Sequence, residues 1–305
     1  MKVLVTGNLG YIGSVMTPFL AERGIEVTGV DMGFYPLLIP QKPHLKKQVI
    51  KDIRDMTRKD VEGFDAIIHL AALSNDPTGE LNPSWTQDIN FLVTKRLAAL
   101  AKEAGVKRFL FSSSCSVYGA RGDELLDERA DVAPVSEYAK SKVLAERAVV
   151  EMADRKFCTV VLRNGTAYGA SPRMRFDLAI NNMVAHASAF GTVKILSDGT
   201  AWRPFVHVKD IAQAFYAMLM EEKEKISGQT FNVGSGEGNL RVIDIAKKIQ
   251  SQLGARVEFS PGAQKDPRSY RVDFSRIQRV TGFRPRVTVE ESVREMADFL
   301  RGIGY

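Results

Sequence analysis

The sequence predicts an α/β protein built on a doubly wound parallel sheet, with a smaller α/β region toward the C-terminus. Short apolar runs alternate with longer amphipathic stretches through the first half of the chain, which is typical of strands alternating with helices. The first apolar run, residues 2–5, breaks into a turn with three evenly spaced glycines. The alternation loosens near residue 166. We therefore expect residues 1–165 to form the sheet domain and residues 166–305 to form mainly a second region, with some segments returning to the first.

The glycine turn has the spacing Gly7-x-x-Gly10-x-x-Gly13. A side chain at Gly7 would obstruct the tight turn, and one at Gly10 would keep a pyrophosphate away from the backbone. A side chain at Gly13 would push the following helix, expected over residues 14–23, off the strand. The N-terminus of that helix favours an anion. A glycine triplet alone also fits an ordinary strand-to-helix turn, so a dinucleotide site needs support from the residues beyond the helix.

An acidic residue ends the second expected strand. That strand covers residues 25–30 and is followed by Asp31, about 20 residues after the glycine turn. A carboxylate there can accept hydrogen bonds from both hydroxyls of an adenosine ribose, and it would repel a 2′-phosphate. The order of strand, turn, helix and acid therefore predicts a Rossmann-type dinucleotide site and favours NAD over NADP.

Further strands of the same apolar kind follow before residue 120. We expect an irregular Pro-rich stretch at 35–43, strands at 48–50, 64–72 and 108–112, and a helix at 85–100. The strand at 64–72 ends in small residues, which let a ligand lie against the backbone. In a doubly wound sheet, ligands bind outside the carboxyl ends of the strands, which is where these motifs fall.

Three polar side chains could supply acid-base chemistry beside such a cofactor. Tyr138 and Lys142 lie four residues apart in a helix expected at 137–147, so they project from one face, and Ser114 follows the strand at 108–112. A surface pair of this spacing is the alternative interpretation. A tyrosine has an ordinary pKa of about 10, and a neighbouring ammonium would stabilise its phenolate. Tyr138 could then remove a hydroxyl proton while Ser114 hydrogen-bonds the same oxygen.

The composition is that of an ordinary globular protein, with 45% hydrophobic residues and a formal net charge of +6. The basic residues are scattered among acids, without the arrays of a nucleic-acid surface. We therefore expect an anionic small molecule and no nucleic acid as partner. No apolar stretch approaches the roughly 18 residues that span a bilayer, and we find no leader sequence and no metal-binding cluster. Two cysteines give no disulfide framework, so we expect a cytoplasmic protein without a membrane partner.

Several motifs occur together and in the same order as in a known family. They are Thr6-Gly-x-x-Gly-x-x-Gly13, Asp52-Ile53, His69-Leu-Ala-Ala72, Ser112-Ser-Ser114, Val117-Tyr-Gly119, Tyr138-x-x-x-Lys142 and Leu162-Arg163. With this set, the chain resembles the extended short-chain dehydrogenase/reductase family. Within it, the chain is similar to the NAD-dependent epimerase/dehydratase type, of which UDP-galactose 4-epimerase is a familiar member. The resemblance covers nearly the whole chain.

The resemblance implies roles for individual residues. Ser114, Tyr138 and Lys142 match the catalytic positions of the family. Contacts with NAD are implied for Gly7, Gly10, Tyr11, Ile12, Gly13, Asp31, Asp52, Ile53, Leu70, Ala71, Ala72, Leu73, Asn90, Tyr138, Lys142 and Gly165. The family usually has an aromatic residue after Leu-Arg, whereas this chain has Asn164-Gly165-Thr166. This departure leaves open which face of the nicotinamide meets the substrate.

The same resemblance implies that the second half of the chain binds a nucleotide-diphosphate sugar. Residues 202–210 resemble the family's Arg-x-x-x-x-His-Val-x-Asp signature. A guanidinium fork matches phosphate oxygens, and a structural salt bridge is the alternative for each arginine. The candidate substrate-binding residues are Ser114, Arg173, Arg175, Asn182, Arg203 and Arg268. We expect His207 to order the fold, and Asp210 to cap a helix at 211–220.

A glycine-rich segment at 231–238 could be mistaken for a second phosphate loop. It lacks the Lys-Ser/Thr ending of such a loop, so we interpret it as a strand and turn before a helix at 242–253. A closing amphipathic helix is expected at 288–301.

The residues next to Ser114 weigh against two other reactions of the family. Related dehydratases have an Asp-Glu pair where this chain has Cys115-Ser116, so a 4,6-dehydratase is disfavoured. Some reductase-epimerases use a cysteine two residues before the motif's tyrosine. Cys115 lies three residues before Tyr118, and we interpret it as a packed residue.

Two enzymatic functions remain open. In an NAD-dependent epimerase, hydride leaves a sugar carbon, which we expect to be C4, and returns to its other face, so the cofactor is not consumed. In a nucleotide-sugar dehydrogenase or ketoreductase the cofactor turns over. Asp31 mildly favours the first, because biosynthetic reductases more often use NADPH. A non-catalytic NAD-binding regulator is disfavoured because the serine, tyrosine and lysine are all present. The resemblance also leaves both a homodimer, through the helices that carry Asn90 and Tyr138, and a monomer open.

Overall fold

In the part of the chain that the structure describes, the large sheet has seven parallel strands in the order β11-β7-β5-β4-β1-β2-β3. Its strands are β1 (Lys2–Thr6), β2 (Glu26–Asp31), β3 (Lys47–Ile50), β4 (Ala66–His69), β5 (Arg108–Ser114), β7 (Cys158–Asn164) and β11 (Gln229–Val233). The computed structural model describes residues 1–35, 37–39, 44–74, 76–266 and 268–304, so the Pro-rich stretch expected at 35–43 lies partly outside the described residues. The chain builds outward from β1 in both directions. This arrangement confirms the predicted doubly wound α/β fold.

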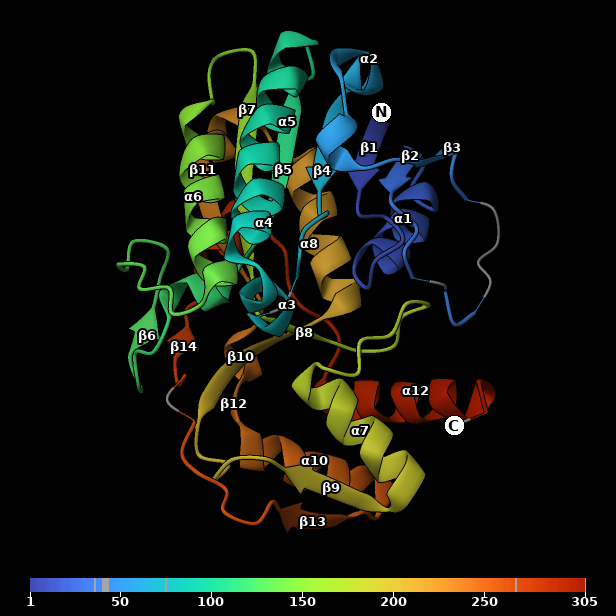
Figure 1. Ribbon diagram of the computed structural model, residues 1–305, viewed down its shortest axis with the longest axis vertical. Helices are drawn as coiled ribbons and strands as arrows, with labels where there is room; N and C mark the ends of the chain where they lie inside the picture. Colours follow the sequence, from blue (N-terminus) through green and yellow to red (C-terminus); the bar gives the residue numbers. More distant parts are fainter. Residues whose placement is uncertain (36, 40–43, 75, 267, 305) are drawn as a thin grey trace.

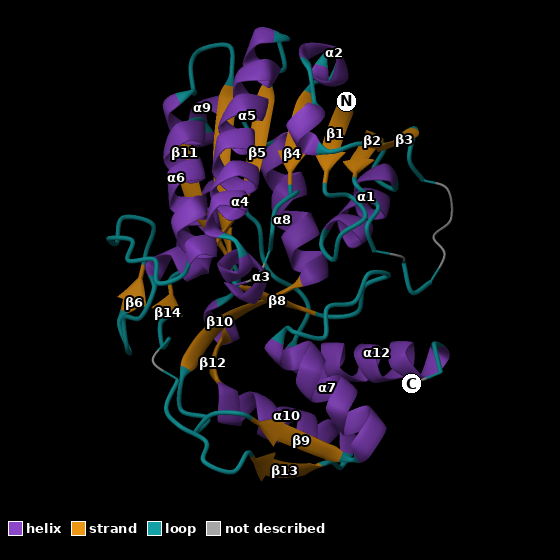
Figure 2. Cartoon of the chain, in the orientation of Figure 1, coloured by secondary structure: helices purple, strands orange, loops and turns teal. Residues whose placement is uncertain are grey.

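Helices cover both faces of this sheet (Figure 1, Figure 2). The described helices are α1 (Gly13–Ala21), α2 (Arg58–Val61), α3 (Asp76–Leu81), α4 (Pro83–Gln87), α5 (Val93–Glu103), α6 (Glu137–Glu151), α7 (Ala179–Phe190), α8 (Val208–Met220), α9 (Lys223–Ile226), α10 (Val242–Leu253), α11 (Ser275–Thr281) and α12 (Val289–Gly302). Side chains alternate between the faces of each strand. Val3 and Val5 therefore pack with α1 and α8, whereas Leu4 packs with α5 on the other face.

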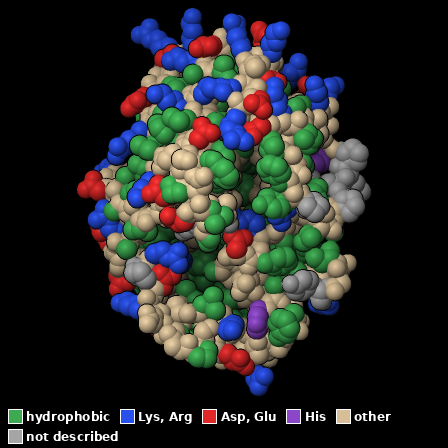
Figure 3. Space-filling model, in the orientation of Figure 1, with side chains coloured by type: hydrophobic (Ala, Val, Ile, Leu, Met, Phe, Trp, Pro, Cys, Tyr) green, Lys and Arg blue, Asp and Glu red, His purple; other side chains and the backbone are tan. Residues whose placement is uncertain are grey.

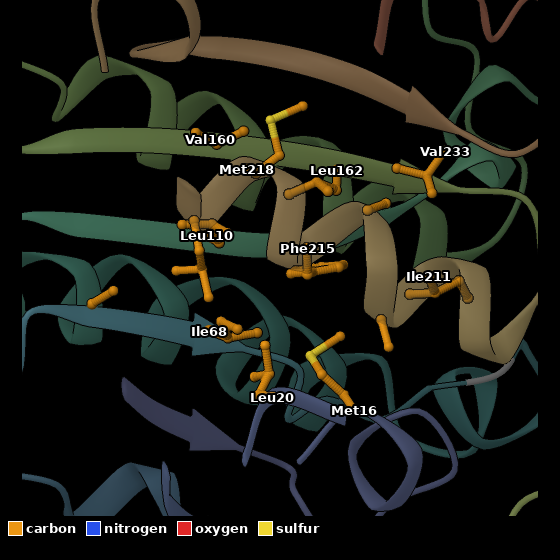
Figure 4. Packing of buried hydrophobic residues seen from close by; sticks show 14 of the residues in the cluster. Met16, Leu20, Ile68, Leu110, Val160, Leu162, Ile211, Phe215, Met218 and Val233 are labelled. Atoms are coloured by element: carbon orange, nitrogen blue, oxygen red, sulfur yellow. The ribbon is translucent and has the colours of Figure 1, made fainter. Parts of the chain in front are cut away.

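The face covered by α1 and α8 shows why the apolar runs of the sequence become buried strands. Met16 and Leu20 of α1 and Phe215 of α8 lie over β4, β5 and β7 (Figure 4). Each of these three side chains is fully buried. Burying such a side chain contributes about 1.5–3 kcal/mol. Because α8 and β11 belong to the second half of the chain, part of that half completes the first domain.

Most other elements of the second half form a smaller region beneath the carboxyl ends of the large sheet (Figure 1), whereas α9 and α11 pack against β7 and β11 of that sheet. The strands of the smaller region are β8 (Thr166–Tyr168), β10 (Trp202–His207) and β12 (Asn239–Arg241) in one sheet, and β9 (Thr192–Ile195) with β13 (Arg256–Phe259). A strand of the first half, β6 (Leu125–Leu126), pairs with β14 (Arg271–Val272). A second hydrophobic core joins α7, α10 and α12, and it includes Ile180, Ile249 and Met296.

Two expectations about helices need correction. The helix expected at 85–100 is α4, then a π-helical turn at Asp88–Leu92, then α5. The helix expected to begin after Asp210 begins at Val208, and its N-cap is His207, whose Nδ1 accepts from Lys209 N at 3.2 Å. Asp210 therefore does not cap it. Its carboxylate instead accepts hydrogen bonds from the backbone N–H groups of Arg286 and Val287, which leads the chain into α12.

Candidate active site

The turn between β1 and α1 is packed so closely that two of its glycines have no room for a side chain. Gly7 has φ +74°, and a Cβ atom there would lie 2.7 Å from the backbone N of Ala71, in the loop after β4. A Cβ at Gly13 would lie 2.3 Å from the carbonyl oxygen of Gly7. A hydrogen bond from Gly10 N to Gly7 O closes the turn at 3.1 Å. The bare backbone at the start of α1 fits the approach of a pyrophosphate.

Asp31 lies at the carboxyl end of β2, beside the glycine turn. Its Oδ2 accepts a hydrogen bond from Leu9 N at 3.0 Å, and its Oδ1 accepts one from Gly33 N at 2.9 Å. Each carboxylate oxygen has a further acceptor position, so the side chain can still receive the hydroxyls of a ribose. The bond from Leu9 joins the carboxylate directly to the turn.

Asp52 and Ile53 lie after β3 and have local structural partners. Asp52 caps a 3₁₀ turn, Ile53–Asp55, and its carboxylate forms an ion pair with the Arg54 guanidinium at 2.7 Å. The hydrogen bond from Arg54 lowers the pKa of Asp52. Ile53 is buried in the core on the α5 side of the sheet. Their contact with an adenine therefore stays a prediction.

A cavity of about 510 Å³ lies between the large sheet and the second region, within the range usual for small-molecule sites. Figure 3 shows it as a hollow in this face of the molecule. Among the residues that line it are Ile12, Leu70, Ala72, Ser114, Tyr138, Lys142, Asn164, Gly165, Arg175, Arg203 and Arg268. Ile12 is the residue of the glycine turn that reaches this lining, whereas the three glycines and Asp31 lie outside it, near the ends of β1 and β2. The cavity thus joins the expected catalytic residues to three of the candidate arginines.

Lys142 of α6 is buried beneath the cavity, with only 3% of its surface exposed. Its Nζ donates a hydrogen bond to the carbonyl oxygen of Ser112 at 2.8 Å, and it lies 4.7 Å from the ring centre of Phe111. Burial lowers the pKa of Lys142 to about 8, and the carboxylate of Glu146 opposes that shift. Lys142 is therefore mainly an ammonium at neutral pH.

Tyr138 lies one turn before Lys142, and the Lys142 Nζ is 5.7 Å from the centre of its ring. Ser136 caps α6 by accepting from Ala139 N at 3.2 Å, which fixes the first turn of the helix. Gly79 of α3 packs against the Tyr138 Cβ, because a side chain on Gly79 would lie 3.3 Å from it. Tyr138 also interacts electrostatically with Arg175. Two cations therefore favour its phenolate.

The three serines at the end of β5 have different partners. Ser112 Oγ accepts from Asn164 Nδ2 at 3.0 Å, and Ser113 Oγ donates to the buried carboxylate of Glu146. Ser114 Oγ accepts from Ser116 N at 3.2 Å as the cap of a 3₁₀ turn. Because Ser114 accepts in this contact, its hydroxyl proton can be donated into the cavity, where it suits a developing carbonyl oxygen.

Two buried polar atoms on the cavity wall have no hydrogen-bond partner among the described residues. They are Asn164 Oδ1 and Ser116 Oγ. Buried polar groups are normally satisfied, so orphaned ones in a cavity fit a polar ligand such as the carboxamide of a nicotinamide. Asn164 begins the segment Asn164-Gly165-Thr166, where the resemblance implied an aromatic residue.

Asn90 does not line the cavity and is 1% exposed. Its Oδ1 accepts from Leu73 N at 2.8 Å, and its Nδ2 donates to Leu73 O and to Ser141 Oγ, each at 3.1 Å. The π-helical turn places this side chain, and such turns are frequent at functional sites. Asn90 therefore holds the loop after β4 against α6, and any cofactor contact through it stays a prediction.

Three of the four candidate arginines line the cavity. Arg203 and Arg268 line the cavity and share the carboxylate of Asp266, with N–O distances of 2.6 Å and 3.1 Å. Arg175 also lines it, paired with Asp177 at 2.6 Å. The sequence motifs assign no role to Asp266, two residues before Arg268.

Arg173 and Asn182 lie outside the cavity lining. The Arg173 guanidinium stacks over the Tyr35 ring at 4.2 Å, and Asn182 Nδ2 donates to Phe176 O at 2.9 Å. Both side chains thus have structural partners, and a substrate contact through either of them stays a prediction. Spacing alone could not reveal this, because it does not show where the loop before α7 turns.

Tyr11 joins the glycine turn to the second region. Its hydroxyl donates to the carbonyl oxygen of Gly169 at 2.7 Å and accepts from Asn181 Nδ2 at 3.2 Å. Burial raises the pKa of Tyr11, so its side chain is a neutral structural group. A pyrophosphate contact would therefore have to come from its backbone.

His207 and Cys115 are both buried, and neither side chain lines the cavity. His207 packs against Tyr168, with ring centres 5.2 Å apart, and burial lowers its pKa to about 3. Burial raises the pKa of the Cys115 thiol, and the Sγ contacts Arg163 O at 3.2 Å. A buried neutral thiol is a poor nucleophile.

Among the described residues, no group of three or more His, Cys, Asp or Glu side chains is placed to hold a metal ion. No described helix has the length and apolarity needed to cross a bilayer.

A doubly wound sheet with a bare glycine turn, and a serine, tyrosine and lysine on one cavity, defines a dinucleotide-dependent enzyme. The chain matches the NAD dependent epimerase/dehydratase family over residues 3–234 and belongs to that family. The family predicted from the motifs is thereby confirmed.

Individual relatives cover almost the whole chain. It is 30% identical over 318 residues to a UDP-glucose 4-epimerase of Mycolicibacterium smegmatis, covering 99% of each chain. It is 28% identical over 312 residues to a UDP-glucuronic acid decarboxylase of Arabidopsis thaliana, covering 99% of this chain and 69% of the other. A solved structure of MoeE5 in complex with UDP-glucuronic acid and NAD has a TM-score of 0.86 and 28% identity, covering 99% of each chain.

Proposed function

We propose that this protein is an NAD-dependent epimerase that inverts one sugar carbon, C4, of a UDP-sugar by transient oxidation and re-reduction. The observation that carries the proposal is the meeting of Ser114, Tyr138 and Lys142 on the wall of a cavity that also holds Arg203 and Arg268. The similarity to a UDP-glucose 4-epimerase supports the reaction, and the nucleotide in the names of the relatives supports UDP.

NAD would lie along the carboxyl edge of the large sheet. The turn at Gly7–Gly13 would receive its pyrophosphate and Asp31 its adenosine ribose. Leu70–Leu73 and Gly165 would lie along its middle and nicotinamide half, where the orphaned oxygen of Asn164 fits its carboxamide. Once bound, NAD supplies the acceptor and donor of hydride.

The protein's own residues would move and hold the proton. Tyr138 as phenolate accepts the proton of the sugar hydroxyl, and later returns it. Lys142, mainly an ammonium at neutral pH, stabilises that phenolate. Ser114 donates a hydrogen bond to the same sugar oxygen as it becomes a carbonyl. Arg203 and Arg268 would hold the diphosphate with guanidinium forks, which places the sugar at the reacting end of the cavity.

The test is product analysis with a panel of UDP-sugars. The purified protein is incubated with UDP-glucose, UDP-galactose and UDP-glucuronate, and the products are separated by chromatography. The proposal predicts a C4 epimer without net change in absorbance at 340 nm. Loss of carbon dioxide from UDP-glucuronate would indicate a decarboxylase instead. Stoichiometric formation of NADH would indicate a net dehydrogenase.

Three further assignments belong to this proposal. Residues 1–165 would mainly bind NAD and residues 166–305 mainly the sugar nucleotide. The unpaired cysteines Cys115 and Cys158 support a reducing compartment such as the cytoplasm. The exposed side chains of Trp85, Leu92 and Leu144 lie on or beside the helices that would join two copies, and they support a homodimer, which light scattering can test.

A further inference from the structure

A buried ionic network lies behind the cavity and is centred on Glu146, one turn after Lys142 on α6. Glu146 is 4% exposed. Its Oε1 accepts from Ser113 Oγ at 2.5 Å and from Arg163 Nε at 3.0 Å, and its Oε2 accepts from Arg163 Nη2 at 2.7 Å. Arg163 Nη1 also donates to Tyr118 Oη at 3.0 Å. The sequence motifs did not assign any role to Glu146.

The partners of Glu146 lie at the cavity wall or next to it in the sequence, and Ser113 itself lines the cavity. Ser113 lies between Ser112, whose carbonyl binds Lys142, and Ser114. Arg163 directly precedes Asn164. The carboxylate thus ties α6 to β5 and β7, the strands that present Ser114 and Asn164. Removing two charges from water carries a free-energy cost that their mutual attraction has to offset, so well-packed hydrophobic side chains would stabilise the fold equally well.

The charge of Glu146 also reaches Lys142. Burial disfavours the Lys142 ammonium, and Glu146 is the acid that opposes this shift. Among the described groups on this side, Arg163 is a cation paired with Glu146, and three others carry little charge. His69 of β4 is neutral because burial lowers its pKa to about 3, and burial raises the pKa of both Tyr118 and Cys115. On the cavity side, Lys142 faces Tyr138, which Arg175 also influences.

We propose that Glu146 is a positioning residue, which holds α6 in register with β5 and β7 and keeps Lys142 positively charged beside Tyr138. It thereby sets the pH at which Tyr138 ionises. This inference rests on the proposed function only in taking Tyr138 as the base. Glu146 itself is not among the residues that line the cavity.

The test is a spectroscopic titration of Tyr138 in the NAD-loaded protein. The phenolate absorbs near 295 nm, and subtracting the titration of the matching Tyr138→Phe protein isolates the signal of Tyr138. Glu146→Gln keeps the shape and an acceptor oxygen but removes the charge. We expect it to raise the midpoint of Tyr138 by about one pH unit, because Lys142 then loses its proton more easily. Glu146→Asp keeps the negative charge on a shorter side chain, so its midpoint should lie between those of Glu146→Gln and the wild-type protein.

A second variant separates the charge of Glu146 from the cost of leaving Arg163 unpaired. Glu146→Gln with Arg163→Met removes both charges, so it should fold more stably than the single variant. Its Tyr138 midpoint should stay above the wild-type value, though by less than in the single variant, because the Arg163 cation is lost as well. Asp210→Asn is the matched control, because Asp210 is another buried acid and lies outside the cavity lining. It should lower the melting temperature without moving the midpoint.

The outcomes separate this inference from the proposed function. If Glu146→Gln and the double variant lower the melting temperature but leave the Tyr138 midpoint in place, Glu146 is only structural and the inference is overturned. If the wild-type midpoint itself lies near 10, Tyr138 is a neutral phenol at pH 7 and cannot act as the base that the proposed function requires. The difference between wild type and variant still decides the role of Glu146 in that case.

Discussion

Arg203 and Asp266 form an ion pair 2.6 Å long on the wall of the cavity, and the same carboxylate binds Arg268. In the proposed enzyme these two arginines receive the diphosphate of the sugar nucleotide. Asp266 therefore occupies guanidinium groups that the substrate's phosphates would need. An acid in this place keeps the arginines oriented but competes with the ligand.

Replacing Asp266 by Asn should tighten the binding of UDP roughly threefold to tenfold, since the competing charge is lost. Calorimetric titration with UDP measures this directly. Asp298→Asn, which breaks an exposed pair with Arg301, is the control and should leave UDP binding unchanged. Weaker binding by Asp266→Asn would show that orienting the arginines outweighs competition.

Replacing Asp31 by Ala should weaken NAD binding by roughly tenfold or more, because a carboxylate that accepts ribose hydroxyls is lost. The same change should relax the rejection of NADP. Fluorescence titration with both cofactors gives the two affinities. Asp55→Ala removes an exposed acid after β3 and serves as control. An unchanged ratio of the two affinities would contradict the ribose assignment.

Replacing Lys142 by Met should change the pH dependence of turnover as well as its size. Without the ammonium, the pKa of Tyr138 should move toward its ordinary value of about 10. Turnover at pH 7 should then fall by about a hundredfold or more, and the residual rate should rise with pH up to that value. A uniform loss across pH 6–10 would mean that Lys142 acts through structure alone.

The low pKa values of two buried histidines predict that the free energy of unfolding falls in acid. Burial lowers the pKa of both His69 and His207 to about 3. The unfolded chain therefore binds more protons than the folded chain between about pH 3 and 6.5, and the free energy of unfolding falls as pH decreases through this window. Each histidine contributes about 1.4 kcal/mol per pH unit within it.

His207→Asn keeps a side chain that can cap α8 but removes one titrating group. Urea unfolding at several pH values from 4 to 7 gives the free energy of unfolding as a function of pH. For the variant, the slope of this free energy against pH should be smaller by the equivalent of about one proton. The variant will also lose packing against Tyr168, but that cost is the same at every pH. An unchanged slope would contradict the assignment of a depressed pKa to His207.

The fold and much of the site could be predicted from local sequence because local rules govern them. Apolar runs set the strands, the Gly7–Gly13 spacing set the turn, and helical periodicity placed Tyr138 and Lys142 on one face. The structure does bring Ser114 to the same cavity.

The rest depended on contacts between distant segments. Arg173 and Asn182 lie outside the cavity because of how the loop before α7 turns against Tyr35 and Phe176. Asp210 was wrongly expected to cap α8, because its partners come from residues 286 and 287, far along the chain. Glu146 and Asp266 gave no signal of their own in the sequence, since a lone acid becomes informative only when its partners are known.

Turnover of the Tyr138→Phe protein, measured together with its affinity for NAD, tests the central claim most directly. The measurement uses the UDP-sugar that the wild-type protein converts fastest. We expect kcat to fall by about a thousandfold, since the base is lost. The Kd for NAD should stay within about twofold of the wild-type value. Near-normal kcat with intact NAD binding would show that another group takes the proton and would contradict the account.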